Sequence, residues 1–165
     1  MPSHPGPKRD QAVDALVAVA PLVSRWMERL LAAHRPRLTL AQYLALRAIG
    51  REALGAGELA QRTGVSGPAV SQLVAGLVGL GLVRRSPAPD DRRRHELTLS
   101  AAGERALRSA TEVMRDRLGA AIDELPRPEA DALARALPTV EAILSGAPPP
   151  RRPHPPKPPG PGKRP

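Results

Sequence analysis

Apolar residues recur at three- and four-residue steps over most of the chain, the spacing that predicts amphipathic helices. One helical pattern covers residues 10–34 and a second covers residues 39–52. Ser100 can cap a long helix that reaches about residue 125 and carries a narrow apolar seam at near-heptad spacing. A last pattern covers residues 129–144. The chain is therefore predicted to be mainly α-helical.

Proline and threonine mark the limits of the first two helices. Pro21 should kink or restart the first helix, because proline lacks an N–H and clashes with the preceding turn. Pro36 ends it, and Thr39 can cap the second helix. The first helix is expected to place its apolar residues on one side: Val13, Leu16, Val17, Ala20, Val23, Met27, Leu30 and Leu31. The second is expected to bury Leu40, Leu44, Ala45 and Ala48.

Two shorter helices are predicted between these long ones. The first covers residues 58–63 and lies between Gly57 and Gly64, the latter at a turn where glycine accepts a positive φ. The second follows Ser66, which can cap it, and has Pro68 in its first turn, where a missing N–H costs nothing. Its apolar face is formed by Val70, Leu73, Val74, Leu77 and Leu80.

A two-stranded wing follows the second short helix. Gly81 ends the helix, as glycine commonly does beyond a C-terminus. Residues 82–86 and 95–99 then predict two strands with Val83, Leu97 and Leu99 facing inward. The connecting loop opens with two prolines, closes with three arginines, and completes a helix-turn-helix with a wing.

The face opposite the apolar stripe of the second short helix is small and polar. It carries Ser71, Gln72, Ala75, Gly76 and Gly79. Such a helix can lie deep in a major groove, where the Gln72 amide can pair with adenine N6 and N7. Ser66 and Ser71 can contact phosphates or bases, and Gly67 and Pro68 permit close approach at the helix start. The alternative is that Gln72 is a solvated surface residue and Ser66 only a cap.

The loop arginines Arg92, Arg93 and Arg94 fit a wing tip that enters the minor groove. Asp91 is expected to pair with a wing arginine and to hold the shape of the loop. Arg84 is the expected phosphate contact on the first strand, since Arg84 and Arg85 alternate across it. A solvated charge run is the alternative, but its place between two strands after a reading helix favours DNA contact.

The succession GELAQRTGVS, a helix ending in LGLV, and RRSPAPDDRRRHELTLSAAG resembles the MarR family of bacterial winged-helix regulators. The resemblance covers roughly residues 16–144, and residues 38–46 resemble the helix that precedes the motif. The matching residues are Leu59, Ala60, Val65, Val70, Leu73, Leu77, Gly81, Leu82, Val83, Asp91, Arg92, Arg93, Leu97, Thr98, Leu99 and Gly103. The chain departs from the family at Ala75 and Gly76, where many relatives carry a charged pair.

The resemblance implies a winged helix-turn-helix with N- and C-terminal dimerisation helices. The apolar stripes of the terminal helices independently argue for a homodimer, since a small wing domain offers too little surface to cover them. Family members often bind a small molecule in a cleft between the dimerisation helices and the wing domain. The matching regions contain Trp26, His34, Tyr43 and Arg47, and Trp26 and Tyr43 are alternatively core or interface residues.

These patterns predict one domain with two loose ends. A disordered arm is expected at residues 1–9 and a basic, proline-rich disordered tail at 146–165. The tail is a solubilising end, a source of nonspecific phosphate attraction, or a proline-rich ligand for a partner protein. The domain between them covers residues 10–145. Its DNA-binding part is residues 38–100, and its dimerisation helices are residues 10–35 and 100–145.

Charge and composition exclude several functions. The net charge of +9 favours a polyanionic partner. There is no cysteine, the four histidines lack ligand spacing, and no catalytic motif is visible, so we expect no metal, no cofactor and no enzymatic activity. Without a signal peptide or a bilayer-spanning run, the protein is expected in the cytoplasm.

The sequence thus predicts a ligand-responsive repressor that binds double-stranded DNA as a homodimer on a pseudo-palindromic operator. One alternative is an effector-independent architectural DNA binder, which predicts steep salt dependence and little sequence preference. Another is a protein-interaction module, for which neutralising residues 92–94 would leave partner binding intact.

Overall fold

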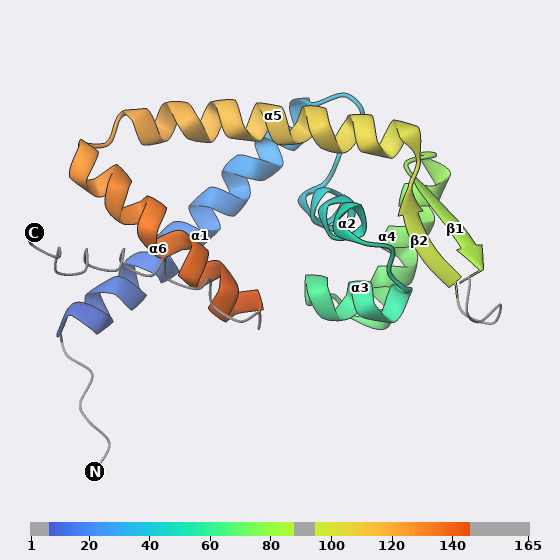
Figure 1. Ribbon diagram of the computed structural model, residues 1–165, viewed down its shortest axis with the longest axis horizontal. Coiled ribbons are helices and arrows are strands. Elements are labelled where there is room, and N and C mark those ends of the chain that lie inside the picture. The colour runs from blue at the N-terminus through green and yellow to red at the C-terminus, as the bar shows by residue number, and fades with distance from the viewer. Residues whose placement is uncertain (1–6, 88–94, 146–165) are drawn as a thin grey trace, which may run out of the picture. The chain divides into compact units, whose positions relative to one another are not determined.

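The computed structural model describes residues 7–87 and 95–145 and divides the chain into two units, Met1–Ala120 and Ala121–Pro165. Within the described part, helices and strands follow the predicted order, and Figure 1 labels them. They are α1 Pro7–Ala33, α2 Leu40–Arg51, α3 Ala56–Thr63, α4 Gly67–Gly79, β1 Val83–Pro87, β2 His95–Leu99, α5 Ala101–Asp123 and α6 Arg127–Ser145.

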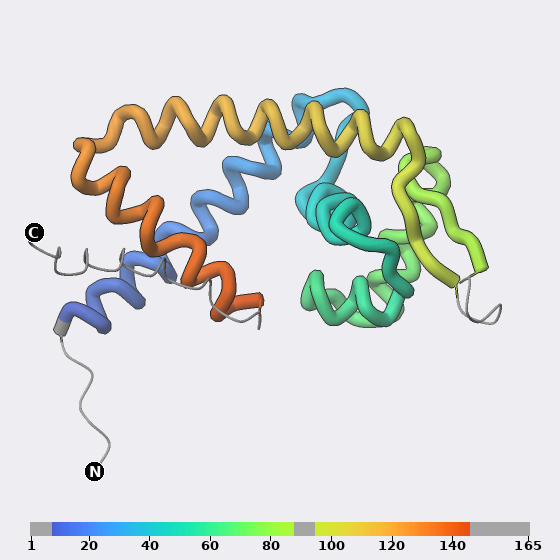
Figure 2. Tube along the Cα trace, viewed as in Figure 1, coloured from blue at the N-terminus to red at the C-terminus, as the bar shows by residue number. Residues whose placement is uncertain are grey.

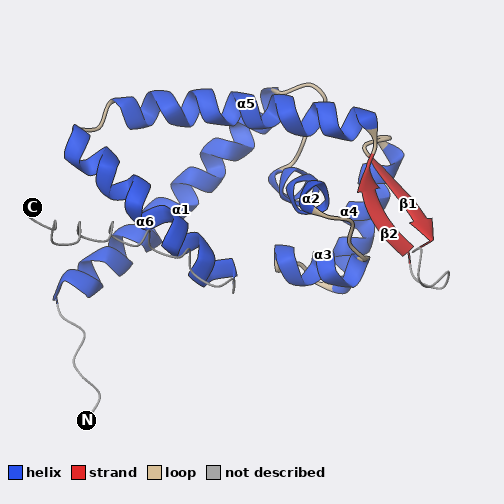
Figure 3. Cartoon of the chain, viewed as in Figure 1, coloured by secondary structure: helices blue, strands red, loops and turns tan. Residues whose placement is uncertain are grey.

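The predicted fold class is confirmed. The described residues form a mainly helical chain with one two-stranded antiparallel sheet, which Figure 3 shows among the helices. The strands pair from Val83 opposite Leu99 to Pro87 opposite His95. Leu54 forms an isolated bridge to Leu97 on the other side of β2, so the segment after α2 is fixed to the wing.

Helix α1 differs from its prediction in two ways. It begins at Pro7, so residues 7–9 belong to the helix rather than to the predicted arm. It also continues through Pro21, so the helix does not restart there, and the alternative expectation of a kink stays a prediction. Pro21 lies on an exposed stretch of the helix, so the backbone carbonyl that loses its intrahelical partner there can be hydrated. The loss of one hydrogen bond is therefore tolerated without ending the helix.

Helix α2 begins as predicted but turns a different face to the core. The Thr39 hydroxyl accepts a hydrogen bond from the backbone N–H of Gln42 at 3.1 Å, and the Gln42 side chain accepts from the Thr39 N–H at 2.9 Å, which completes a capping box. The buried residues are Tyr43, Ala45, Leu46 and Ile49. The prediction that Leu44 is buried was wrong: its side chain is exposed, because the helix contacts α1, α3, α4 and β2 through its other faces.

The turn between α3 and α4 follows the prediction except at its cap. Gly64 ends α3 with a φ of +66°, and Pro68 lies in the first turn of α4. Ser66 occupies the N-cap position of α4, but its side chain makes no capping hydrogen bond. Helix α4 therefore begins without a side-chain cap, with the backbone of Ser66 extended and a proline in the first turn.

A single hydrophobic core holds α2, α3, α4 and the wing together. Its buried side chains come from each of these elements, from the end of α1 and from α5, which contributes Ala106, Ala110 and Met114. The fully buried ones include Leu31, Leu46, Leu54, Leu59, Leu77, Leu97 and Val70. Figure 2 shows the tube of α2, α3 and α4 beside the hairpin. This core fixes α4 against the rest of the unit through one of its faces.

Helices α5 and α6 follow the wing. Ser100 caps α5 as predicted, since the Gly103 N–H donates to its hydroxyl at 3.0 Å. The expected narrow seam of α5 is partly used within the chain, because Met114 is buried while Leu118 is exposed. Pro128 lies in the first turn of α6, so the break between the two helices falls at Pro126. In the second unit, Leu133 and Leu137 of α6 are exposed.

Candidate DNA-binding surface

Helix α4 has one buried and one exposed face. Val70, Val74 and Leu77 are buried in the core. The predicted reading residues Ser71 and Gln72 are exposed on the other face, together with Ala75, Gly76 and Gly79. The core therefore holds α4 through its apolar side and leaves the small and polar side free for a macromolecular groove.

The start of α4 brings several predicted contacts together. Ser66, Gly67 and Pro68 are all exposed. The Ser71 hydroxyl donates to the Gly67 carbonyl at 3.2 Å, so its oxygen lone pairs remain available as acceptors. The Ser66 hydroxyl is not used in capping, so it can donate to a phosphate without loosening the helix.

The wing register separates the two arginines of β1. Arg85 pairs with Leu97 and Arg84 pairs with Thr98. Side chains of directly opposed residues lie on the same face of a sheet, and Leu97 is buried in the core. Arg84 therefore lies on the face away from the core, as its prediction as a phosphate contact requires. Its contact with DNA stays a prediction.

The charged wing tip lies outside the described residues. Asp91, Arg92, Arg93 and Arg94 belong to residues 88–94, for which the structure gives no account. Their predicted roles, minor-groove contact for the arginines and loop structuring for Asp91, stay predictions. The described strands bring both ends of this segment to the same end of the hairpin, at Pro87 and His95.

Two of the four predicted ligand-binding residues have internal hydrogen-bond partners. His34 Nδ1 lies 3.0 Å from the Pro36 carbonyl, and Nε2 lies 2.7 Å from the Ser109 hydroxyl of α5. The carbonyl can only accept, so Nδ1 is the donor there. The buried Tyr43 hydroxyl lies 3.3 Å from the Thr111 hydroxyl, whose own proton is donated to the Leu107 carbonyl at 2.7 Å, so Tyr43 donates. Both residues link the α1–α2 region to α5.

The other two predicted ligand-binding residues lie on different helices. Trp26 is half-buried on α1, and Arg47 is exposed on α2. A ligand role for Trp26, His34, Tyr43 and Arg47 stays a prediction. In His34 and Tyr43, such a role requires the ligand to share or replace an existing hydrogen bond.

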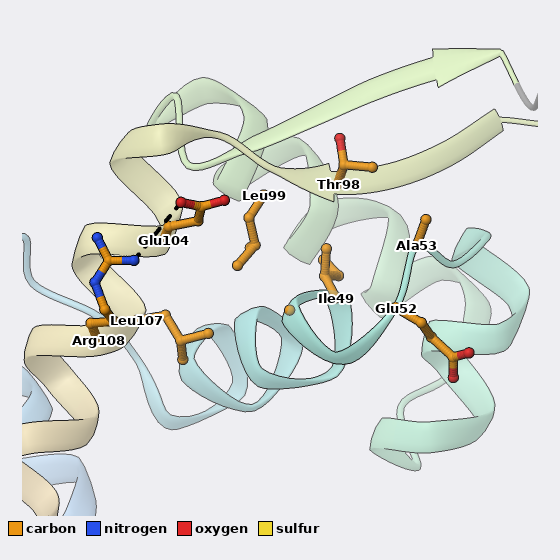
Figure 4. Close-up of a pocket in the computed structure, with 9 residues that line it drawn as sticks. Ile49, Glu52, Ala53, Thr98, Leu99, Glu104, Leu107 and Arg108 are labelled. Carbon is orange, nitrogen blue, oxygen red and sulfur yellow. Dashed lines mark ion pairs between the residues drawn. The ribbon is translucent and has the colours of Figure 1, made fainter.

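A cleft of about 610 Å³ lies between the end of α2, strand β2 and the first turns of α5. Figure 4 shows Leu99 and Leu107 extending toward its interior, with the Glu104–Arg108 ion pair at its edge, 3.8 Å between nitrogen and oxygen. The lining residues are Ile49, Gly50, Glu52, Ala53, Thr98, Leu99, Glu104, Leu107 and Arg108. None of the four predicted ligand residues lines it.

Sequence reasoning missed this cleft because it depends on packing across distant segments. A Cβ at Gly50 would lie 3.0 Å from Leu107 Cδ2 and 3.1 Å from Leu99 Cδ1. The absence of a side chain on α2 therefore lets leucines from β2 and α5 approach the helix. A glycine inside a helical pattern is the one local signal of such an approach, and it does not identify the partners.

Other kinds of site find no support in the part of the chain that the structure describes. Across residues 7–87 and 95–145, no cluster of three or more metal-binding side chains occurs. No helix within the same ranges is long and apolar enough to cross a membrane. The predicted DNA contacts that the structure describes lie at the start and on the exposed face of α4 and on β1.

A winged helix-turn-helix that presents such a surface defines a class of DNA-binding regulators. Residues 38–94 match the sequence model of the MarR family. An uncharacterized HTH-type transcriptional regulator of Mycobacterium bovis is 30% identical over 112 residues, covering 67% of this chain and 78% of the relative. The chain belongs to the MarR family of DNA-binding transcriptional regulators.

Solved structures agree with this fold. FabT of Streptococcus pneumoniae, solved in complex with DNA, matches with a TM-score of 0.69 and 17% identity over 84% of this chain and 98% of its own. The MarR family protein Rv2887 of Mycobacterium tuberculosis, solved in complex with p-aminosalicylic acid, matches with a TM-score of 0.64 and 23% identity over 77% of this chain and 95% of its own. At these identities the likeness concerns the fold.

Proposed function

We propose that this regulator binds a pseudo-palindromic operator as a homodimer, represses transcription there, and is released by a small molecule. The observation that carries the DNA-reading part is the division of α4, whose apolar face is buried in the core while Ser71 and Gln72 are exposed. Two such helices in a dimer reach successive major grooves about 10 bp apart. Repression follows when the occupied operator overlaps a promoter.

The dimer is supported by the apolar surface of α1. Val13, Leu16 and Val17, which share one side of the helix, are exposed in the single chain, and Val17 is 68% exposed. A contiguous apolar face on a long helix is the kind of surface that a partner subunit covers. In unit 2, described by itself, Leu137, Ile143 and Leu144 of α6 are likewise exposed.

Base discrimination rests on Gln72. It is the long hydrogen-bonding side chain on a face otherwise formed by serine, alanine and glycine. Its amide can donate to adenine N7 and accept from adenine N6, and such a bidentate pair discriminates by about 1–3 kcal/mol. Wing contacts by Arg84, Arg92, Arg93 and Arg94 then add phosphate attraction and minor-groove recognition.

The test is fluorescence anisotropy with duplexes selected from a random pool and with shuffled controls, at several salt concentrations. We expect the selected duplex to bind about 10³-fold more tightly than the control. Gln72→Ala should lower affinity for the selected duplex about 5- to 150-fold and affinity for the control far less. Gln61→Ala, at an exposed glutamine on α3, is the matched control. Equal binding of the selected and shuffled duplexes, lost as salt rises, would instead support an architectural DNA binder.

Release by a small molecule can be read in the same titration. We place the effector in the predicted group of Trp26, His34, Tyr43 and Arg47, with the α2–β2–α5 cleft as the second position. Because a solved neighbour is in complex with p-aminosalicylic acid, this compound is the first probe. Weaker operator binding in its presence supports the proposal. Arg47→Ala and Arg108→Ala then distinguish the two positions, since an aryl carboxylate would pair with the arginine at its own site.

A further inference from the structure

The start of α5 is hydrogen-bonded to the turn that ends α4. Ser100 is 7% exposed. Its hydroxyl donates to the Gly81 carbonyl at 2.6 Å and accepts from the Gly103 N–H at 3.0 Å. Its backbone N–H donates to the Leu82 carbonyl at 3.0 Å. One buried serine thus binds both the first turn of α5 and the segment that follows α4.

Gly103 brings the two segments into direct backbone contact. A Cβ at this position would lie 2.0 Å from the Leu82 carbonyl oxygen and 2.9 Å from its carbon. These atoms belong to the backbone and cannot rotate away. The close approach of α5 to Leu82 therefore requires glycine, and any side chain must displace the helix or the turn.

The turn at Gly81 and Leu82 is also hydrogen-bonded to the end of α4. Gly81 has a φ of +69°, and its N–H donates to the Val78 carbonyl at 2.9 Å. The Leu82 N–H donates to the Leu77 carbonyl at 3.0 Å. This is the Schellman arrangement, which closes a helix and fixes the direction of the chain leaving it. A continuous set of hydrogen bonds therefore runs from α4 through Leu82 to α5 without passing through the wing tip.

We propose that Ser100 and Gly103 form a joint that sets the direction of α5 relative to the reading helix α4. In the homodimer proposed above, on which this inference rests, that direction sets the distance between the two reading helices. The joint therefore determines which half-site spacing the dimer accepts. Ser100 and Gly103 act as positioning residues, since they act through α4 and need not touch DNA.

A simple cap would not need the contact to Gly81. Thr39, which caps α2, bonds within its own capping box. Ser100 performs the same local task toward Gly103 and in addition donates across to Gly81, 19 positions away. The second bond contributes nothing to capping the N-terminus of α5, but it does restrict how α5 can rotate against α4.

The experiment compares Gly103→Ala with Gly119→Ala. Gly119 lies on the same helix, and a Cβ there meets nothing within 4 Å. Each full-length protein is titrated with duplexes that carry two selected half-sites at spacings varied in single base-pair steps, and with a duplex that carries one half-site. Thermal unfolding and sedimentation confirm that each variant is folded and has the same oligomeric state as the wild type.

We expect wild type and Gly119→Ala to share one preferred spacing. Gly103→Ala should keep its affinity for the single half-site within twofold and lose about 10- to 100-fold at the wild-type spacing, because the second half-site can no longer be engaged together with the first. Its preferred spacing should move or flatten. Ser100→Ala should behave in the same way, and Ser100→Thr, which keeps the hydroxyl, should restore the wild-type profile.

Each contrary result has a distinct meaning. If Gly103→Ala folds and keeps the wild-type spacing profile, the joint does not set the geometry. Equal loss of affinity on single and paired half-sites would overturn the proposal too, since it indicates damage to the reading unit itself, that is, to α2, α3, α4 and the wing. If Gly103→Ala does not fold, Ser100→Ala and Ser100→Thr decide the question. If wild type shows no spacing preference, the proposed palindromic dimer fails, and the joint with it.

Discussion

The reading unit and helix α1 carry the same kinds of apolar side chain, but these are buried within the chain in the reading unit and exposed over most of α1. Leu46 and Leu59, from α2 and α3, are completely buried within the chain. Leu22 and Val17, from α1, are 54% and 68% exposed. In α1 itself, Leu31 is buried near the C-terminal end, where the helix contacts α2, while the apolar residues of the N-terminal half are exposed.

The difference lies in whether the chain folds back on the apolar face. Helices α2, α3 and α4 and the wing are joined by short turns and close on one another, so each covers the others. The first two-thirds of α1 has no such cover within its unit. Amphipathic periodicity therefore identifies the face that will be buried, and the connections decide whether it is buried by its own chain or by another molecule.

The largest expected effect comes from breaking the α1 face. Val17→Asp should leave the reading core folded and shift the protein to monomer. A buried valine side chain contributes about 1.5–3 kcal/mol, and the dimer loses it twice, so the dimer dissociation constant should rise at least about 100-fold. Sedimentation over a concentration series measures this.

The control for Val17→Asp lies on the same helix. Gln11 is exposed and polar, so Gln11→Asp adds the same charge and should leave the dissociation constant nearly unchanged. A dimer that survives Val17→Asp would show that this part of α1 is not the interface.

The second effect concerns the core. Leu46→Ala should lower the free energy of unfolding by about 2–5 kcal/mol, because it leaves a cavity where neighbouring side chains cannot close fully. Leu16→Ala, at an exposed position on the apolar side of α1, should cost far less at concentrations where the protein is monomeric. Urea unfolding of both variants checks the contrast, and similar losses in the two would remove the distinction between core and α1 face.

The smallest expected effect distinguishes the two N-cap positions of the reading unit, Thr39 and Ser66. Thr39→Ala removes a complete capping box and should cost about 1 kcal/mol of stability, with little effect on DNA affinity. Ser66→Ala removes a hydroxyl that makes no capping bond, so stability should hardly change while operator affinity falls. Thermal unfolding and anisotropy on the same samples test this. A loss of stability in Ser66→Ala without loss of affinity would make Ser66 a cap after all.

The sequence predicted the elements whose signals are local. Gly64 and Gly81 mark turns because both adopt positive φ, and Pro68 marks a helix start. The apolar face of α4 was correct at Val70, Val74 and Leu77. These features depend on residues within a few positions, so periodicity and turn chemistry are sufficient to predict them.

The failures are places where neighbours distant in sequence decide. Leu44 has a helical spacing suited to the core, yet the other faces of α2 are the ones that meet partners. Ser100 was predicted to cap α5, but its bond to Gly81 depends on how α4 and α5 meet. Gly103 matches a family motif in the sequence, but the reason that this position requires glycine is the nearby Leu82 carbonyl, which the sequence does not reveal.

The half-buried Trp26 gives this regulator a built-in optical reporter. It is the single tryptophan of the chain, the core of the reading unit contains no other indole, and Phe is absent. Its emission therefore reports the surroundings of α1, while circular dichroism follows the helices of the whole chain. On dilution, a shift of emission to longer wavelength at constant ellipticity would record subunits separating while each stays folded, without any attached dye.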